Sequence, residues 1–264
     1  MDLDFDPEEI RRYSRHILLA EVGGTGQAKL RNARILIIGA GGLGSPLLLY
    51  LAAAGIGHIT LVDDDVLDLS NLQRQIAHTT AGIGQPKVEN AAAAARAINP
   101  LVTIETHQTR ATPKTILPLI HSHDLVCDGT DNFPARFLIA DACVIAKKTL
   151  VSAAVLRFEG QLATFKPHAG PDCPCYRCLH PEPPPEGLVP GCGEAGVLGA
   201  VTGVMGTLQA TEVLKEILEI GETLAGRLLL WDALATRFRT IKLPRNPTCS
   251  ACGPQGFTTL NHHA

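Results

Sequence analysis

Four glycines follow directly after a run of branched apolar residues in the stretch RILIIGAGGLGSPL, from Arg34 to Leu47. Gly39, Gly41 and Gly44 make a G-x-G-x-x-G pattern, in which Gly42 stands beside the second glycine. A strand, a tight glycine turn and the start of a helix direct main-chain N–H groups at a phosphate. The same glycines would also let a helix pack closely against a strand, so a purely structural use stays open. The pattern predicts a nucleotide site, and it fits NAD and ATP equally well.

Four charged residues belong to the predicted site, and three of them distinguish between the two nucleotides. Asp63 ends the next apolar run, about 20 residues after the turn, where a carboxylate can bind the ribose hydroxyls of either ligand. Arg74 and Lys87 bring two cations towards the same edge of the predicted sheet, although either alone would more often be a surface charge. Asp131 follows the buried run at 124–128, where a carboxylate can hold Mg²⁺. Displacement at a polyphosphate needs cations and a metal, whereas hydride transfer does not, so these residues favour ATP.

Two Cys-x-x-Cys pairs, Cys175 with Cys178 and Cys249 with Cys252, form a second candidate site. Paired knuckles of this kind predict a structural zinc held by four thiolates. The long interval between the pairs means that the metal would clip an irregular loop region to the carboxyl-terminal part of the chain. A redox use is the alternative, but neither pair opens a helix after a strand. Cys173 offers a further thiol that could compete as a zinc ligand.

Composition narrows the class of protein. The chain has 264 residues, of which 45% are hydrophobic, enough for a packed core in one large α/β domain. A net charge of −3 with scattered basic residues argues against broad nucleic-acid or membrane-surface binding. No apolar run approaches the roughly 20 residues that span a bilayer, and the acidic start lacks the features of a signal peptide. We therefore expect a cytoplasmic protein in which the eight cysteines point to metal or thiol chemistry rather than to disulfides. Cys127 and Cys143 are the exceptions and are expected in the core.

Alternating strand and helix patterns position these groups at one edge of a sheet. The expected strands are 34–38, 58–63, 102–107, 124–128 and 149–155, and the expected helices are 43–54, 85–98 with Pro86 at its first position, 113–120 and 132–148. Strands that alternate with helices predict an α/β fold with a doubly wound, mostly parallel, Rossmann-like sheet.

The pattern changes after residue 155. The run RFEGQLATFKP predicts an antiparallel extension, and five prolines within 179–191 predict an irregular, mobile crossover loop. A helix at 195–219 and strands at 227–232 and 236–243 are expected to return to the sheet. Near the amino terminus, the pattern of residues 5–30 predicts a short helical segment before the first strand.

Eight sequence blocks resemble the HesA/MoeB/ThiF family, in the family's order and over about residues 9–253. They are RYSRHILL, GAGGLGS, LVDDDVLDLSNLQRQ, GQPKVE, DGTDN, CYRC, EAGV and NPTCSAC. Members of the family adenylate sulfur-carrier proteins and are related to ubiquitin-activating enzymes, and MoeB-like members are the nearest likeness. The resemblance implies a single ThiF-type adenylation domain over 1–264. Within it we expect a helical amino-terminal segment (1–30), a nucleotide-binding core (31–155) and a carrier-binding, zinc-clipped part (156–264).

The resemblance also implies roles by position. Arg15 matches the arginine that reaches from one subunit into its neighbour's nucleotide pocket, which implies a homodimer. Lys87 would lie on the phosphates, and Asp131 with Asn132 would complete the Mg-ATP site. Cys192 matches a cysteine that in some members forms a thioester or a sulfur link with the carrier, and its place before a helix can lower a thiol's pKa. The residues expected to contact the nucleotide are Gly39, Gly41, Gly42, Asp63, Ser70, Asn71, Leu72, Gln73, Arg74, Lys87, Asp131 and Asn132.

The implied substrate is a small ubiquitin-like protein that ends in Gly-Gly. Its terminal carboxylate attacks the α-phosphate of ATP, which yields an acyl-adenylate and pyrophosphate. A carboxyl terminus has a pKa of about 3.5 and is already ionised at neutral pH, so the reaction needs no general base. A tail without Cβ atoms also fits a narrow channel to the phosphate.

Two other functions remain open on the sequence. An NAD(P)-dependent oxidoreductase would need a nicotinamide-side catalytic dyad, and none is evident. A non-catalytic scaffold that binds the carrier has no reason to keep Arg15, Arg74, Lys87 and Asp131 together. The sequence does not select among carriers for molybdopterin, thiamine or tRNA thiolation. Because no rhodanese-like domain follows the second knuckle, we expect a separate sulfur donor, either a sulfurtransferase or a cysteine desulfurase.

Overall fold

A computed structural model describes residues 4–185, 187–188 and 195–263 of the chain. Its strands form one sheet in the order β3-β2-β1-β4-β5-β6-β7-β8. The strands are β1 (Arg34–Ile38), β2 (His58–Val62), β3 (Thr103–His107), β4 (Leu125–Asp128), β5 (Thr149–Leu156), β6 (Glu159–Phe165), β7 (Arg227–Asp232) and β8 (Arg237–Lys242). β1 to β5 are parallel, and β6, β7 and β8 continue the sheet as antiparallel strands. The predicted α/β class and the antiparallel extension are therefore confirmed.

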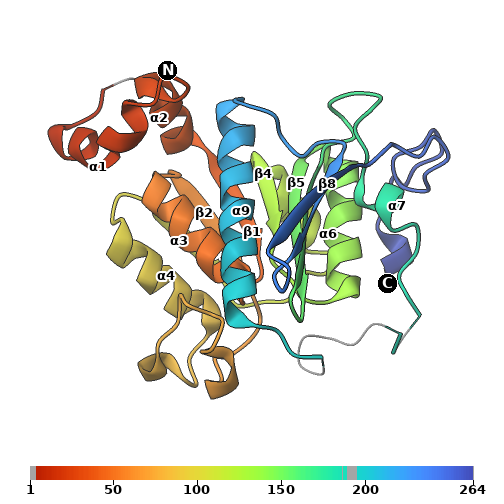
Figure 1. The fold of residues 1–264 in the computed structure, drawn as a ribbon, viewed down its shortest axis with the longest axis horizontal. Helices are drawn as coiled ribbons and strands as arrows, with labels where there is room; N and C mark the ends of the chain where they lie inside the picture. Colours follow the sequence, from red (N-terminus) through yellow and green to blue (C-terminus); the bar gives the residue numbers. More distant parts are fainter. Residues whose placement is uncertain (1–3, 186, 189–194, 264) are drawn as a thin grey trace.

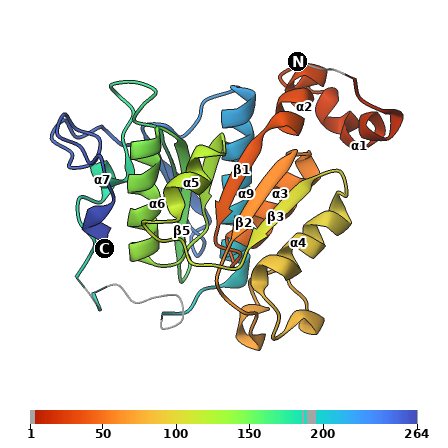
Figure 2. The same ribbon diagram turned by 180° about the vertical axis from the view of Figure 1, so that it is seen from behind.

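Helices cover both faces of the sheet (Figures 1 and 2). They are α1 (Pro7–Ile17), α2 (Gly23–Asn32), α3 (Gly44–Ala54), α4 (Lys87–Ile98), α5 (Ile116–His121), α6 (Phe133–Ala146), α7 (Tyr176–Leu179) and α9 (Gly199–Leu218), with the short 3-10 turns η1 (Leu69–Asn71), η2 (Thr80–Gly82) and η3 (Asn261–His263). Figure 1 shows α3, α4 and α9 on one face, and Figure 2 shows α5 and α6 on the other.

The central strand has apolar residues on both sides because both faces of the sheet are covered. Ile35 and Ile37 of β1 pack in the core cluster that includes α3, α4 and α9 residues. Leu36 and Ile38 pack in the cluster that includes residues of α5 and α6. The sequence therefore reads as a continuous apolar run in β1 rather than as an alternating one.

The parallel strands end in register at one edge of the sheet. Ile38 of β1 is paired with Val62 of β2 and with Asp128 of β4. The segments after these three residues, which carry the glycine turn, Asp63 and the DGTDN block, therefore emerge side by side. Ligands of open α/β sheets bind at such a carboxyl edge.

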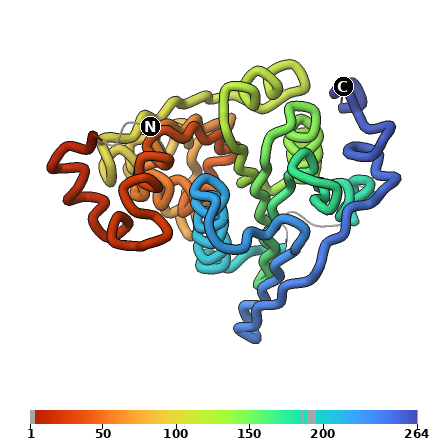
Figure 3. The backbone as a smooth tube through the Cα atoms, turned by 90° about the horizontal axis from the view of Figure 1, so that it is seen from above, coloured from red at the N-terminus to blue at the C-terminus, as the bar shows by residue number. Residues whose placement is uncertain are grey.

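The amino- and carboxyl-terminal parts lie at opposite ends of the molecule. Figure 3 shows the red amino-terminal helices at one end and the blue carboxyl-terminal segment at the other. The expected helical segment at 5–30 consists of two helices, and the second begins at Gly23, which has a positive φ of 58°. Asp6 caps α1 in a reciprocal capping box with Glu9.

Some boundaries differ from the prediction, and one short helix was missed. Pro86 is the residue before α4 rather than its first helical residue, because its ψ of 133° is extended. The helix expected from 195 begins at Gly199 in α9. The four-residue helix α7 after Cys175 was not predicted, and part of the proline-rich loop (186 and 189–191) lies outside the described residues. Among the helices that the structure describes, none is long and apolar enough to cross a membrane.

Candidate functional site

The glycine turn joins β1 to α3 where backbone segments approach closely. Gly39 has a φ of 102°, and a Cβ there would come within 2.7 Å of the Gly129 carbonyl oxygen. A Cβ on Gly44 would overlap the carbonyl oxygen of Gly39. Close packing thus accounts for these two glycines, which is the structural use that the sequence left open.

The turn also leaves main-chain donors available. Gly39 N–H donates to Val62 O at 2.8 Å. In the described parts of the chain, the N–H groups of Gly41, Gly42, Leu43 and Gly44 have no main-chain acceptor. Unpaired N–H groups at the start of a helix form a ready site for a phosphate.

Asp63 connects the turn to the loop after β2. Its Oδ2 accepts a hydrogen bond from Ala40 N–H at 2.7 Å, and its Oδ1 accepts one from Asp65 N–H at 2.9 Å. Burial raises the pKa of the Asp63 carboxyl, while the two N–H bonds and the charge of Lys87 act in the opposite direction. The structure therefore places Asp63 against the glycine turn, at the position expected of the ribose-binding carboxylate.

Lys87 begins α4 beneath the same loop. Its side chain is 7% exposed, and its Nζ donates to Asp65 Oδ2 at 2.6 Å. Its N–H donates to Asp65 O at 3.0 Å, so main chain and side chain hold the loop together. A desolvated ammonium at this edge is suited to a phosphate oxygen.

The run from Ser70 to Arg74 forms η1 and the turn after it. Asp68 and Asn71 cap η1 reciprocally, which fixes the loop without help from a strand. Arg74 Nη1 donates to Ser70 O at 3.1 Å. Thr202, in the first turn of α9, touches the Arg74 carbonyl oxygen with its Oγ1 at 3.5 Å. The run is thus held between the carboxyl edge and α9.

The DGTDN block follows β4 on the other side of the glycine turn. Asn132 caps α6, since its Oδ1 accepts from Ala135 N–H at 3.0 Å. Asp131 is exposed, and within the residues described here it makes no hydrogen bond or ion pair. Its carboxylate is therefore free for a metal ion.

Asp128 anchors this block, and the sequence analysis did not single it out. It is 1% exposed and accepts hydrogen bonds from Thr130 N–H at 2.9 Å, Thr130 Oγ1 at 2.6 Å and Ser152 Oγ at 2.7 Å. Arg136 supplies its counter-charge at 3.6 Å and also donates to Thr130 O. An aspartate directly after a buried apolar strand is the signal that could have indicated it.

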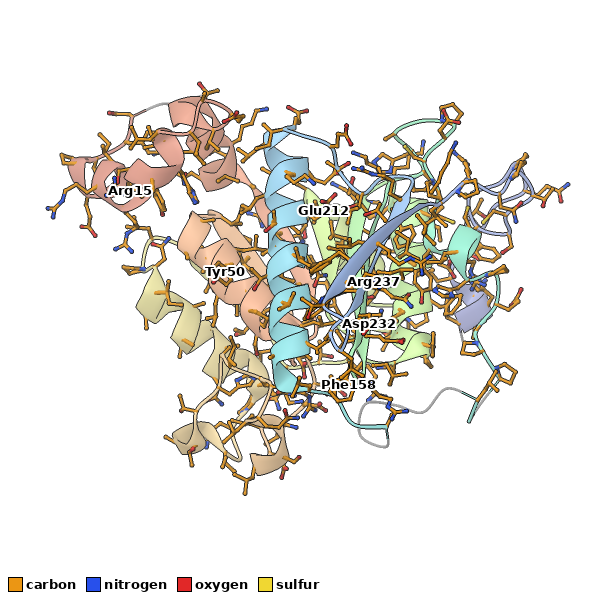
Figure 4. The ribbon with its side chains drawn as sticks, in the orientation of Figure 1. Arg15, Tyr50, Phe158, Glu212, Asp232 and Arg237 are labelled. Atoms are coloured by element: carbon orange, nitrogen blue, oxygen red, sulfur yellow. The ribbon has the colours of Figure 1, made fainter. Side chains whose placement is uncertain are left out.

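Arg15 lies far from this edge within its own chain. It is exposed on α1, and in Figure 4 it lies at the upper left, well apart from Phe158 at the lower centre, which follows the carboxyl end of β5. The structure therefore brings Gly39, Asp63 and Lys87 together but leaves Arg15 apart from them.

The two cysteine pairs come together in one cluster. Their Sγ atoms all lie within 4.8 Å of one another, with separations of 3.9 Å between Cys175 and Cys178, 3.5 Å between Cys175 and Cys249, and 3.6 Å between Cys178 and Cys252. Four sulfurs placed tetrahedrally around zinc at about 2.3 Å would be about 3.8 Å apart, so the set fits this metal. The arrangement of the four thiols therefore suits a zinc ion. Cys173, which is partly exposed, is not one of the four.

The surroundings of the cluster also suit a thiolate site. Asn246 N–H and Ala251 N–H each point at a cluster sulfur at 3.4 Å, which favours the charged form of the ligand. Ala251 is buried, and Val144 and Phe257 pack against the cluster. The four-thiol cluster joins α7 and the residue before it to the segment after β8.

The other cysteines divide into two groups. Cys127 and Cys143 are fully buried, and burial raises the pKa of each thiol, so both are core residues as expected. Cys192 lies outside the described residues.

A second polar cluster beside the clip was missed by sequence analysis. Asp141 on α6 is 1% exposed and receives the Arg177 guanidinium in a bidentate contact at 2.9 Å. His262 and His263 also reach Asp141 Oδ2, at 3.0 and 2.8 Å. These three side chains could converge on a metal, but Arg177 already occupies both carboxylate oxygens. We therefore infer that the cluster is structural and holds the carboxyl-terminal turn η3 against α6.

Two features mark a nucleotide-binding protein of the Rossmann-like α/β class. One is the glycine turn with its unpaired N–H groups, and the other is the buried Lys87, which pairs with Asp65 in the loop that Asp63 ties to that turn. Its family follows from comparison with known proteins. Residues 13–251 match the ThiF family, and the chain belongs to that family.

Similar proteins support this family membership over almost the whole chain. The chain is 45% identical to the "SAMP-activating enzyme E1" of Haloferax volcanii, over 98% of this chain and 95% of the relative. It is 47% identical to the "Sulfur carrier protein adenylyltransferase" of Thermus thermophilus, over 94% and 92%. It is 52% identical to "Adenylyltransferase and sulfurtransferase MOCS3" of Bos taurus over 96% of this chain, which spans 55% of that relative.

Solved structures share the fold at lower identity. The crystal structure of Escherichia coli MccB with ATP has a TM-score of 0.79 and 22% identity, and the match covers 91% of this chain and 74% of that one. This likeness supports the arrangement of sheet and helices.

Proposed function

We propose that this chain uses ATP to adenylate the carboxyl-terminal glycine of a ubiquitin-like sulfur-carrier protein and releases pyrophosphate. The observation that carries the proposal is the identity of 45–47% to two relatives whose names state carrier activation, over more than nine-tenths of each. The open glycine turn, with Asp63 and Lys87 beside it, supplies a site of the matching chemistry.

The nucleotide contacts are proposed from position. The N–H groups of Gly41 and Gly42 would meet the phosphates, and Asp63 would accept from the ribose hydroxyls. The run from Ser70 to Arg74 would lie along the nucleotide. Arg74 and Lys87 would exchange their present contacts with Ser70 O and Asp65 for phosphate oxygens.

The reaction transfers an adenylyl group without a base. A carrier carboxylate oxygen forms a bond to the α-phosphorus, and the bond from that phosphorus to the bridging oxygen of pyrophosphate breaks. No proton is moved, because the attacking carboxylate is already ionised at neutral pH. The barrier is the approach of an anion to a polyanion, which Arg74 and Lys87 lower by supplying positive charge.

Asp131 is the proposed magnesium ligand. It is exposed at the carboxyl edge beside Asn132, and carboxylate and carbonyl oxygens are the ligands that Mg²⁺ prefers. A bound Mg²⁺ would neutralise the phosphate charge. Asp128 and its hydrogen bonds to Thr130 and Ser152 would keep the Asp131 loop in place.

We also propose a homodimer in which Arg15 completes the partner's site. Arg15 is exposed on α1 and lies well apart from Phe158 in Figure 4, which supports a role on a neighbouring chain rather than on its own. An arginine supplied to a phosphoryl-transfer site is worth roughly 10³–10⁵ in rate, which sets an upper guide.

Zinc would have a structural part in this function. The four thiols of Cys175, Cys178, Cys249 and Cys252 would hold it, and it would fix the segment after β8 against the start of α7. Cys192 remains a proposed covalent residue. We further propose that sulfur comes from a separate donor and that the reaction takes place in the cytoplasm, where thiols stay reduced.

The decisive experiment is intact-protein mass spectrometry of candidate Gly-Gly carriers mixed with the protein, Mg²⁺ and ATP. A carrier that gains the mass of AMP, and loses this gain when its last glycine is deleted, would support the proposal and identify the substrate. Asp131→Ala should abolish the gain. Asp172→Ala, at an exposed aspartate near the thiol cluster, is the matched control and should keep it.

The other outcomes separate the rival functions. Tight binding of NADH with no modified carrier would favour an oxidoreductase. A carrier that binds but gains no mass would favour the non-catalytic scaffold, and either result would overturn the proposed reaction.

A further inference from the structure

A buried histidine touches the glycine turn from behind. His78 is 6% exposed, and its Nε2 lies 2.9 Å from the Ala40 carbonyl oxygen. It stands in the irregular segment between η1 and η2, and its own N–H donates to Gln75 O at 3.1 Å. Its side chain therefore links this loop to the turn that joins β1 to α3.

The chemistry of the contact fixes the protonation of the ring. Burial lowers the pKa of His78, and the positive charge of Lys87 acts in the same direction, while the hydrogen bond to Ala40 O and the charge of Asp63 oppose the shift without reversing it. A carbonyl oxygen can only accept, so the neutral ring must carry its proton on Nε2 and donate to Ala40 O. The Nδ1 atom is then left with a lone pair, and it is buried without a partner in the described chain.

Ala40 is held from its other side by Asp63. The Ala40 N–H donates to Asp63 Oδ2 at 2.7 Å, while its carbonyl accepts from His78. The peptide groups on both sides of the Ala40 Cα are thus fixed, which leaves little freedom in its φ and ψ. In a trans peptide the C=O and the following N–H point in opposite directions. The bond from His78 to Ala40 O therefore aims the Gly41 N–H away from the His78 ring.

A second buried polar residue, Gln75, lies near the Ala40–Gly41 peptide. Gln75 is 3% exposed, and a Cβ placed on Gly41 would lie 3.7 Å from Gln75 Nε2. Gln75 Oε1, like His78 Nδ1, has no partner among the described atoms. An unpaired buried polar atom is costly, and His78 meets this cost while it holds the turn through its hydrogen bond to Ala40 O.

We propose that His78 is a positioning residue for nucleotide binding, which fixes the Ala40–Gly41 peptide so that the Gly41 N–H meets a phosphate oxygen without His78 itself touching the nucleotide. This inference rests on the proposed use of ATP at the glycine turn. His78 would act on nucleotide binding only through its hydrogen bond to the Ala40 carbonyl oxygen.

The test compares two amides that place their donors differently. In His78→Gln the side-chain nitrogen can reach the place of imidazole Nε2, whereas in His78→Asn it reaches only the place of Nδ1. We expect His78→Gln to bind α,β-methylene-ATP with Mg²⁺ within about threefold of the wild type, by calorimetry on the whole protein. His78→Asn should bind about tenfold more weakly, as expected when the hydrogen bond from Gly41 N–H to a charged phosphate oxygen is misplaced. The KM for ATP should rise with it, and kcat should change less.

A matched control addresses a merely structural role. His123 is also buried, with Nδ1 at 2.6 Å from Leu119 O and Nε2 at 2.7 Å from Thr60 Oγ1, but it precedes β4 at the other edge of the sheet. His123→Gln should lower stability and leave the affinity for the analogue unchanged. If His78→Asn does not fold, His78→Leu replaces it as the variant without a donor.

Each result decides the inference. Weak binding by His78→Asn together with rescue by His78→Gln supports it. Equal binding by all His78 variants, or equal weakening by Gln and Asn, overturns it while the proposed function stands. A wild-type protein that does not bind the analogue overturns the proposed function and the role of His78 with it.

Discussion

Lys87 Nζ lies 2.6 Å from Asp65 Oδ2, and this ion pair lies on the loop that Asp63 ties to the glycine turn. The lysine side chain is 7% exposed while the aspartate side chain is 60% exposed. The cation is therefore held near the turn by a partner that water can replace. A triphosphate arriving at the turn can take the ammonium at low cost, because Asp65 is solvated when it is released.

Lys87→Met should lower the rate of carrier adenylation by about 10²–10³, the usual loss when one stabilising donor is removed from a reacting site. The fold should remain, because the exposed Asp65 tolerates the loss of its partner. Rates would be followed by mass spectrometry of the AMP-modified carrier. Lys29→Met, which removes a lysine paired with Glu219 away from the turn, is the control and should keep the wild-type rate. Equal rates for both variants would contradict the role of Lys87.

The thiol cluster should hold one zinc ion per chain. Cys249→Ser should reduce the zinc measured by mass spectrometry of the metal and should lower the melting temperature, since the clip joins segments far apart in sequence. Cys173→Ser should keep both values, because Cys173 stands outside the set of four. Zinc loss from Cys173→Ser, with retention in Cys249→Ser, would show that the ligand set is wrong.

Local patterns predicted the elements around the glycine turn well. The apolar run of β1 and the glycines after it determine a strand, a turn and a helix through neighbouring residues alone. The boundary at Pro86 was misplaced because proline suits both the first helical residue and the residue before it. The choice depends on the contacts of the loop that precedes Lys87, which the local sequence does not contain.

The buried polar residues could not be predicted in the same way. Asp128 depends on Ser152 in the neighbouring strand, and Asp141 depends on Arg177 across a long interval of chain. From sequence alone Asp141 is an acidic residue on a helix, and only the fold brings its partner to it. His78 was missed for the same reason, since its acceptor, Ala40 O, belongs to a turn far earlier in the chain.

Arg177→Met should destabilise the protein by about 3 kcal/mol, because it leaves the buried Asp141 carboxylate without its guanidinium partner. Urea unfolding would measure the loss. Arg110→Met breaks an exposed pair with Asp64 and should cost no more than about 0.5 kcal/mol. A similar cost for both substitutions would show that burial does not strengthen the Arg177 contact. Adding Asp141→Leu to Arg177→Met should recover part of the loss, since no buried charge then remains.

The free energy of unfolding should fall as the pH is lowered below about 6.5. Burial is the main cause that lowers the pKa of His58, His78, His123, His168 and His180 from the ordinary value of 6.5. Between the lowered value and 6.5 the unfolded chain binds more protons than the folded one, so acid favours unfolding there, and these histidines add no slope above this range. Each such histidine adds a slope of up to about 1.4 kcal/mol per pH unit. Urea unfolding at about pH 7.5 and 5.5 would measure this slope, and His123→Gln should reduce it by removing one titrating group. A protein whose stability is constant or higher at the acid end, or a His123→Gln variant with the full wild-type slope, would contradict the prediction.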